Sequence, residues 1–257
     1  MKESIYTIPL MDAFRANDEC PFCVLERQAE QHAISFLLGS GASYMEEDIR
    51  MATDKAGFCR HHMKMMYDYG NRLGTGLILS THMKTYTHEM TKQLKSFTPG
   101  KTSLAQRLKK VQIEEDKPQT SLGQWFQSKE KGCYVCEHFR NNFNRYLDTF
   151  FELYKSDKEF QEMTANSRGF CMPHFINLIE AAENKLNDKQ KESLYPVVFQ
   201  LMEDNFKRLT EEVTRFTDMF DYQNKGKDWG NSKDSIQRCM QKLGGGYPAD
   251  PPFQADR

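Results

Sequence analysis

The sequence lacks the features that mark a membrane-inserted, secreted or nucleic-acid-binding protein. No run of about 18 apolar residues occurs, and the N-terminal segment MKESIYTIPLMDAF has neither the basic start nor the apolar stretch of a signal peptide. The 35 Lys and Arg residues are balanced by 36 Asp and Glu residues, so the surplus of positive charge that phosphate binding needs is absent. We therefore expect a cytoplasmic protein that binds neither nucleic acid nor membranes.

The common catalytic motifs are also missing. The sequence contains no HExxH and no GxSxG, and no carboxylate, serine or lysine is placed to act as a general base. The segments GSGAS (39–43) and GNRLGTG (70–76) are rich in glycine but lack the preceding strand and the lysine of a phosphate-binding loop. These absences favour a protein that is not an enzyme.

Large apolar side chains are plentiful, with 18 Phe, 11 Tyr and 14 Met in 257 residues. They are sufficient for a substantial core, and the length suits one or two domains of roughly 100 to 200 residues each. Apolar residues recur at helical spacing, and no segment alternates as a half-buried strand would. The sequence therefore predicts an all-α fold.

Six of the seven cysteines form a motif that occurs twice. Cys20-Pro-Phe-Cys23 is followed by GFCRHH (57–62), and Cys133-Tyr-Val-Cys136 is followed by GFCMPH (169–174). Cys133 follows Cys20 by 113 residues, and Cys171 follows Cys59 by 112. At that second offset, one apolar helix face matches another: Met83, Tyr86, Met90, Leu94 and Phe97 correspond to Tyr195, Val198, Met202, Phe206 and Leu209. The pattern predicts an internal duplication.

The predicted organisation is two tandem pseudo-symmetric helical repeats, 1–98 and 131–222, separated by a linker at 99–130. Each repeat is expected to contain four helical segments, with the two repeats packed through their long fourth helices. The clearest apolar stripe follows the second CxxC, at Phe139, Phe143, Tyr146, Leu147, Phe150, Phe151 and Tyr154. The linker is expected to hold one short helix around 104–111. Residues 223–257 are expected to form a short helix, capped by Ser232 and buried through Ile236, Cys239, Met240 and Leu243, and then a flexible tail.

The spacing of the cysteines and histidines is typical of metal ligands. Two cysteines at i and i+3 at a helix start place both sulfurs on one side of a turn, where one ion can bind each at about 2.3 Å. CxxH presents one sulfur and one imidazole in the same way. The leading interpretation is one Cys3His site in each repeat: Cys20, Cys23, Cys59 and His62, then Cys133, Cys136, Cys171 and His174. An exchanged arrangement, in which the CxxC of one repeat meets the CxxH of the other, fits the sequence as well. The ligand types favour two zinc ions, with an iron-sulfur cluster as the alternative.

Other interpretations of these residues are weaker. A glutaredoxin-like dithiol needs a strand before the CxxC, and simple burial of thiols does not require the same spacing twice. His62 is preferred over His61 because it aligns with His174, while His138, His82 and His88 lack a matching histidine in the other repeat. Cys239 is expected to be a packed thiol.

The duplicated CxxC…GFCxxH motif, in a helical chain with a Gly-rich tail, resembles an uncharacterised bacterial family of unknown function. The resemblance extends from Cys20 to about Leu243. It supports the duplication and the ligand sets and implies no activity. We therefore expect a structural zinc protein that acts as an interaction or ligand-binding module for an unknown protein or small molecule. The sequence is compatible with a homo-oligomer. The alternative is an iron-sulfur or thiolate-based redox sensor or electron-transfer protein.

Overall fold

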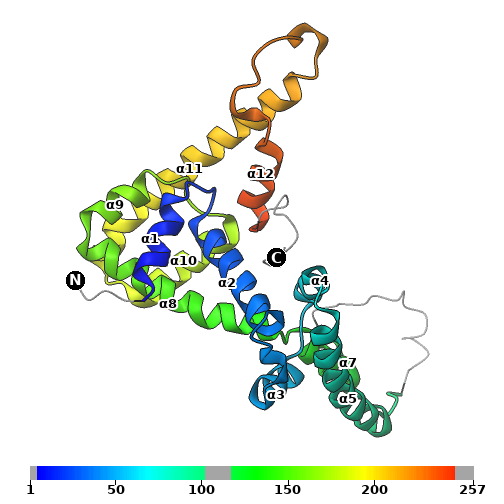
Figure 1. Ribbon diagram of the computed structural model, residues 1–257. Helices are drawn as coiled ribbons and strands as arrows, with labels where there is room; N and C mark the ends of the chain where they lie inside the picture. The colour runs from blue at the N-terminus through cyan, green and yellow to red at the C-terminus, as the bar shows by residue number, and fades with distance from the viewer. Residues whose placement is uncertain (1–4, 102–116, 247–257) are drawn as a thin grey trace. The chain divides into compact units, whose positions relative to one another are not determined.

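The fold of the described residues, 5–101 and 117–246, is entirely helical in the computed structural model (Figure 1). Within these ranges there are eleven α-helices and three short 3-10 helices, and there is no strand. The prediction of an all-α fold is confirmed. None of the helices in these ranges is long and apolar enough to cross a bilayer. The helix expected at 104–111 and the tail beyond residue 246 lie outside the described residues.

The chain divides into two compact units. The described part of unit 1 lies within Met1–Ala29 and Phe139–Pro251, and that of unit 2 lies within Glu30–His138. Helix α2 (Pro21–Leu38) begins in unit 1 and ends in unit 2, whereas α8 (Tyr134–Ser156) begins in unit 2 and ends in unit 1. Each unit therefore contains segments from both of the sequence ranges expected to form repeats.

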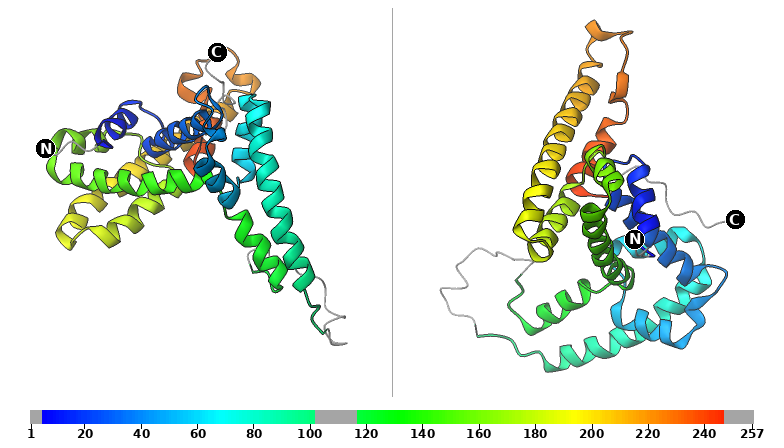
Figure 2. Two further views of the ribbon diagram at one scale, coloured as in Figure 1. Left: turned by 60° about the horizontal axis from the view of Figure 1, so that its bottom comes forward. Right: turned by 90° about the vertical axis from the view of Figure 1, so that its left-hand side faces the viewer.

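Unit 1 is completed by six further helical elements and a terminal helix. They are α1 (Thr7–Arg15), α9 (Lys158–Ala165), α10 (Met172–Lys185), α11 (Asp188–Asp218), η2 (Tyr222–Asn224), η3 (Gly230–Ser232) and α12 (Ser235–Gly244). The 31-residue α11 starts with a capping box, in which Asn187 and Gln190 exchange side-chain to backbone hydrogen bonds. The chain then turns back, so that α12 packs along α11 and α10 (Figures 1 and 2).

The core of unit 1 is built from phenylalanines. Phe14, Phe22, Phe150 and Phe170 are buried and contact one another with ring centroids 5.2–6.5 Å apart. The apolar stripe predicted for α8 is confirmed, because its seven residues all belong to this core or pack against it. Phe22 lies between Cys20 and Cys23, and Phe170 directly precedes Cys171. The core therefore fixes both turns that carry cysteines in this unit.

Unit 2 has a smaller core. Its elements, besides the ends of α2 and α8, are η1 (Ser43–Met45), α3 (Glu47–Ala56), α4 (Arg60–Tyr69), α5 (Arg72–Ser96) and α7 (Ser121–Glu130). The buried cluster consists of Ala33, Ile34, Leu37, Leu38, Phe58, Met66, Ile78, Cys133 and Val135. Figure 2 shows α7 lying beside α5, and their contact includes Trp125 against Tyr86, with ring centroids 5.2 Å apart.

Two expectations about helices differ from the structure in unit 2. Helix α7 lies within the range expected to be a linker, and its start is capped by the side chain of Thr120, which accepts a hydrogen bond from the backbone of Gly123. On α5 the expected apolar face is largely exposed: Met83 is 58% exposed and Leu94 is 53% exposed. The buried residues of α5 are instead Gly74 and Ile78, near its start, where Tyr44 of η1 lies against Gly74.

Helix α12 is buried on the opposite face from the one expected. Its apolar residues Ile236, Met240 and Leu243 are exposed, while Arg238, Gln241 and Lys242 are buried. Ser232 lies in η3 rather than capping α12. The polar face turns inward because Arg238 and Lys242 reach the buried carboxylate of Glu19, while Gln241 donates to the carboxylate of Asp18.

Candidate metal centres

The eight predicted ligands gather into two groups of four, and the grouping crosses the two halves of the sequence. Site 1, in unit 1, consists of Cys20, Cys23, Cys171 and His174. Site 2, in unit 2, consists of Cys59, His62, Cys133 and Cys136. The leading interpretation, with each quartet inside one repeat, is wrong, and the exchanged arrangement is the one that the structure contains.

The length of the helix after each CxxC explains the exchange. Helix α2 has 18 residues, and at about 1.5 Å per residue it carries the chain about 27 Å away from Cys20 and Cys23. Helix α8, with 23 residues, does the same after Cys133 and Cys136. When the chain reaches a GFCxxH turn, it is therefore far from the CxxC of the same repeat. The turn lies instead beside the CxxC of the other repeat.

All of the ligands lie at helix N-termini. Cys59 and Cys171 are the N-cap residues of α4 and α10, with extended backbone, and Cys20 and Cys133 directly precede α2 and α8. The free N–H groups and the positive dipole end at a helix start stabilise thiolates. The glycine of each GFCxxH turn has a positive φ, such as +75° at Gly169, so a residue with a Cβ would be strained there.

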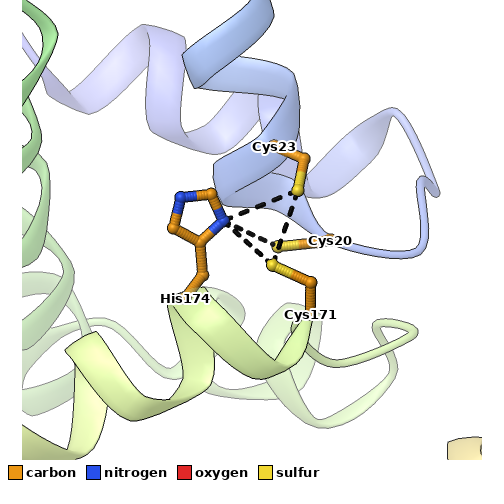
Figure 3. A group of neighbouring side chains, drawn as sticks. All are labelled: Cys20, Cys23, Cys171 and His174. Carbon is orange, nitrogen blue, oxygen red and sulfur yellow. Dashed lines mark hydrogen bonds between the residues drawn. The ribbon is translucent and has the colours of Figure 1, made fainter. Parts of the chain in front are cut away.

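Site 1 has the dimensions of a single tetrahedral ion site (Figure 3). Nδ1 of His174 lies 3.5 Å from Sγ of Cys20, 3.5 Å from Sγ of Cys23 and 3.2 Å from Sγ of Cys171. The sulfurs of Cys23 and Cys171 are 3.6 Å apart. A tetrahedral zinc ion with Zn–S of about 2.3 Å and Zn–N of about 2.0 Å separates its ligand atoms by about 3.5 to 3.8 Å. The side chains are therefore already arranged around one ion-sized centre.

Site 2 repeats this geometry. Nδ1 of His62 lies 3.2 Å from Sγ of Cys59, 3.3 Å from Sγ of Cys133 and 3.4 Å from Sγ of Cys136. The sulfurs of Cys59 and Cys136 are 3.8 Å apart. In both sites, all four ligand atoms lie within 4.8 Å of one another.

In each quartet the imidazole and one cysteine sulfur favour each other's charged form. Burial disfavours the charged form of His62, but hydrogen bonds to Cys133 and Glu30 outweigh it and raise the pKa of His62 to about 10. Burial likewise opposes ionisation of Cys133, but its hydrogen bond with His62 lowers the Cys133 pKa to about 6. In site 1, burial again opposes the imidazolium, and hydrogen bonds to Cys171 and Cys20 raise the pKa of His174 to about 10.

The His174 side of site 1 packs against aromatic rings. Cys20, Cys23 and Cys171 are fully buried, and His174 is 5% exposed. The His174 ring packs against Phe143, with centroids 5.0 Å apart, and its Nε2 lies 3.8 Å from the carboxylate of Glu26. The backbone of Gly245, just after α12, approaches the Cys171 sulfur so closely that a Cβ on Gly245 would lie 3.6 Å from it.

The surroundings of site 2 are more polar and more open. Cys59 and Cys136 are partly exposed, although Cys133 and His62 are buried. Nε2 of His62 lies 3.0 Å from the carboxylate of Glu30, on α2. A carboxylate on the second nitrogen of a metal-binding histidine fixes its orientation and tautomer.

The two turns of site 2 are joined directly to each other. The backbone N–H of Tyr134 donates to the carbonyl of Gly57 at 2.9 Å. Gly132 packs against the carbonyl of Ala56, and a Cβ at Gly132 would lie only 2.5 Å from that oxygen. Small residues therefore let the two turns touch.

Site 1 joins its turns through a third element. Pro21, which corresponds by sequence offset to Tyr134, has no N–H to donate. Instead, the ammonium group of Lys242 donates to the carbonyls of Glu19 and Arg168, at 2.6 Å each. Glu19 and Arg168 occupy the positions that correspond by offset to Gly132 and Ala56.

The side chain of Glu19 completes this connection. It is buried, and its carboxylate forms ion pairs with Arg168 at 3.2 Å and with Arg208 at 2.6 Å. It also lies 3.3 Å from the ammonium group of Lys242. Burial raises the pKa of Glu19, but the hydrogen bond from Arg208 and the surrounding cations hold it below its usual value. Burial lowers the pKa of Lys242. The buried charges of α12 are therefore paired next to Cys20.

The remaining candidate residues lie outside both quartets. His138, His88 and Cys239 belong to neither, and the Cys239 thiol lies 3.8 Å from the carbonyl of Leu209. His82 hydrogen-bonds through Nδ1 with the carbonyl of Asp54 at 2.9 Å and packs against Gly57, so it supports the turn before Cys59.

Sequence reasoning missed two residues that contact the sites. Glu30 follows Cys23 by seven residues, which is the spacing of one helix face, and this spacing was the only available signal for it. Lys242 had no comparable signal, because its position on the polar side of α12 suggested exposure to solvent.

Comparison with known proteins places this chain in a family. The model of DUF6062, a family of unknown function, matches residues 1–250. The chain belongs to this family. No curated protein and no solved structure matches the chain. Family membership therefore covers nearly the whole sequence, and the proposed chemistry depends on the two quartets.

Proposed function

We propose that this DUF6062 protein is a metal-binding helical protein that holds two zinc ions, one in each Cys3His quartet. The observation that carries the proposal is the pair of quartets, each with three sulfurs and one imidazole nitrogen within 4.8 Å. Three thiolates and one imidazole form a common ligand set for structural zinc. Burying four charged or polar groups together, as at site 1, costs free energy unless they have partners. A bound ion would be a partner for all four groups.

Zinc is favoured over the iron-sulfur alternative by the size of the quartets. A cluster distributes its cysteines over different iron atoms, so their sulfurs lie farther apart than the ligands of one ion. One sulfur pair is separated by 3.6 Å in site 1 and one by 3.8 Å in site 2, and all four ligand atoms of each site lie within 4.8 Å of one another, which fits one ion. Absorption near 400 nm in the purified protein would instead indicate iron.

A structural role is favoured over a catalytic one. Catalytic zinc usually keeps one position for water, whereas each quartet supplies four protein donors. In site 1 the ion would connect Cys20 to His174, which are 154 residues apart in sequence. An ion that joins such distant segments binds the folded chain and not the unfolded one, so its binding free energy adds to the stability of the fold.

An internal duplication is consistent with the order of the helices. After the first CxxC the chain forms α2, α3, α4 and α5, and after the second it forms α8, α9, α10 and α11. In each series a GFCxxH turn opens the third helix. We infer that the two halves arose from one ancestral segment.

Elemental analysis of protein purified without added metal tests the proposal. We expect two zinc atoms per chain and no iron. Less than half an atom of any metal per chain would contradict it, and iron with sulfide would support the cluster alternative.

A further inference from the structure

The two quartets differ in their access to solvent. All four ligands of site 1 are buried, and Phe143 and the backbone of Gly245 cover the site. In site 2 the sulfurs of Cys59 and Cys136 belong to partly exposed residues. A chelator or a competing thiol can therefore approach site 2 without opening the core, whereas at site 1 the packed aromatic cluster must first move.

Site 2 also has additional donor atoms on its outer side. The exposed side chain of His61 places Nε2 3.4 Å from the Glu30 carboxylate, which lies 3.0 Å from Nε2 of His62. The donor atoms of Glu30, His61 and His62 all lie within 4.8 Å of one another. His62 is therefore shared, with Nδ1 directed at the sulfurs and Nε2 directed at the outer donors.

In site 1 the positions equivalent to Glu30 and His61 carry no donor side chains. The position that corresponds by sequence offset to Glu30 is Phe143, whose ring packs on His174. The position that corresponds to His61 is Pro173, which has no donor atom in its side chain. The carboxylate nearest to His174 is that of Glu26, at 3.8 Å.

We propose that site 2 is an exchange site for a thiophilic divalent cation, with Glu30 and His61 as outer donors that receive and release the ion, while site 1 releases its ion much more slowly. This inference rests on the proposed function. Glu30 also orients His62, so it contributes to affinity as well as to exchange. His61 contributes to exchange alone, because it contacts the site only through Glu30 and the neighbouring ring of His62.

The test uses the full-length protein loaded with zinc. A colorimetric chelator in excess removes the metal, and short pulses of N-ethylmaleimide mark the cysteines that become free, which peptide mass spectrometry then identifies. We expect two kinetic phases of one zinc each. Cys59, Cys133 and Cys136 should be labelled in the fast phase, and Cys20, Cys23 and Cys171 in the slow phase. Release in a single phase with simultaneous labelling, or earlier labelling of the site 1 cysteines, would overturn the proposal.

The same experiment separates this inference from the proposed function. If the protein binds no zinc before chelator is added, the proposed function fails. If two zinc ions are bound but leave together, only the exchange proposal fails. Because wild-type protein is used, the result does not depend on whether a cysteine variant folds.

Two variants test the outer donors. Glu30→Gln should weaken zinc binding at site 2 by about tenfold or more and leave the slow phase unchanged. His61→Ala should slow both the loading and the release of the fast zinc and leave its equilibrium affinity unchanged, which a purely structural role would not do. The control is His88→Ala, which changes an exposed histidine of the same unit. Rates for His61→Ala equal to those of the control would contradict the role of His61.

Discussion

Sites 1 and 2 have the same ligands but differ in how their two turns are held together. At site 2 the turns touch, through Gly132 against Ala56 and through one backbone hydrogen bond. At site 1 the corresponding residues are charged, and Lys242 of α12 bridges the two turns. The comparison shows that one metal-binding pattern can be built either by close backbone contact or by a helix distant in sequence.

This difference has an energetic consequence. Direct contact between the two turns of site 2 needs only small residues, so the stability of site 2 depends on how closely the two backbones can approach. The bridge at site 1 buries several charges, which are stable only while every partner is present. The two sites should therefore fail under different substitutions.

The largest expected effect is loss of a whole quartet. Cys59→Ser should remove one zinc per chain and leave Cys133 and Cys136 open to alkylation, while Cys20 and Cys23 stay protected, because the quartets are exchanged. Elemental analysis and peptide mapping of alkylated cysteines would measure this. Labelling of Cys20 and Cys23 in this variant would mean that the ligands pair within each half of the sequence instead.

Cys171→Ser is the matched change at site 1. It should remove the other zinc, expose Cys20 and Cys23, and lower helicity more than Cys59→Ser does, because the site adjoins the larger aromatic core. Circular dichroism of the two variants side by side measures the difference. Equal losses of helicity in the two variants would show that the larger core next to site 1 does not increase the effect of losing that site.

Acidification should weaken metal binding steeply. In the metal-free site 2 the pKa of His62 is raised to about 10, so at pH 7 this imidazole must lose a proton before it binds an ion. Burial raises the pKa of Cys136, which adds a second proton to be released. Affinity should therefore rise with pH, by at least about a hundredfold per unit near pH 7 for these two protons alone. Competition with a chelator at several pH values checks the slope, and a pH-independent affinity would contradict it.

Lys242→Met should destabilise unit 1 by about 2 to 4 kcal/mol, because it leaves two buried carbonyls without a donor and removes one partner of Glu19. Denaturant unfolding of the zinc-loaded protein measures the change, and the slow phase of zinc release should become faster. Lys233→Met, at an exposed position before the same helix, is the control and should have little effect. A Lys242 variant as stable as this control would mean that the bridge does not hold site 1.

Gly132→Ala is expected to have the smallest effect and to act on site 2. The added methyl group would lie 2.5 Å from the Ala56 carbonyl, so the turns must separate, at a cost of about 1 to 3 kcal/mol. Faster release of the fast zinc would be the corresponding kinetic result. Gly76→Ala, on α5 where a Cβ meets open space, should instead be neutral or slightly stabilising.

Much of this architecture could be predicted from local sequence patterns. The helical class, the α8 stripe through Phe150 and the identity of the eight clustered residues follow from spacing alone, because spacing determines which side chains share a helix face or a turn. The partner of each half-site does not follow from it. That depends on where α2 and α8 carry the chain, which is a property of helix length and direction.

The face buried by α12 shows a second limit of sequence patterns. Hydrophobic spacing predicts burial of Ile236 and Met240, yet Arg238 and Lys242 are the buried residues. A single buried carboxylate on Glu19, more than 200 residues earlier in the chain, decides the orientation of the helix. Such a pairing between distant charges leaves no periodic signal in the sequence.

The exchanged quartets are nested, like an inner and an outer pair of brackets: the ligands of site 2, from 59 to 136, fall inside the interval from 20 to 174 spanned by site 1. During synthesis from the N-terminus, the inner pair is complete while the second half of the outer pair, and Lys242 with it, is still missing. An ion bound at site 2 would reduce the effective loop between Cys23 and Cys171 to roughly half its length. This lowers the entropic cost of closing that loop at site 1 by about 0.6 kcal/mol. The order of the ligands along the chain therefore predicts that site 2 assembles before site 1.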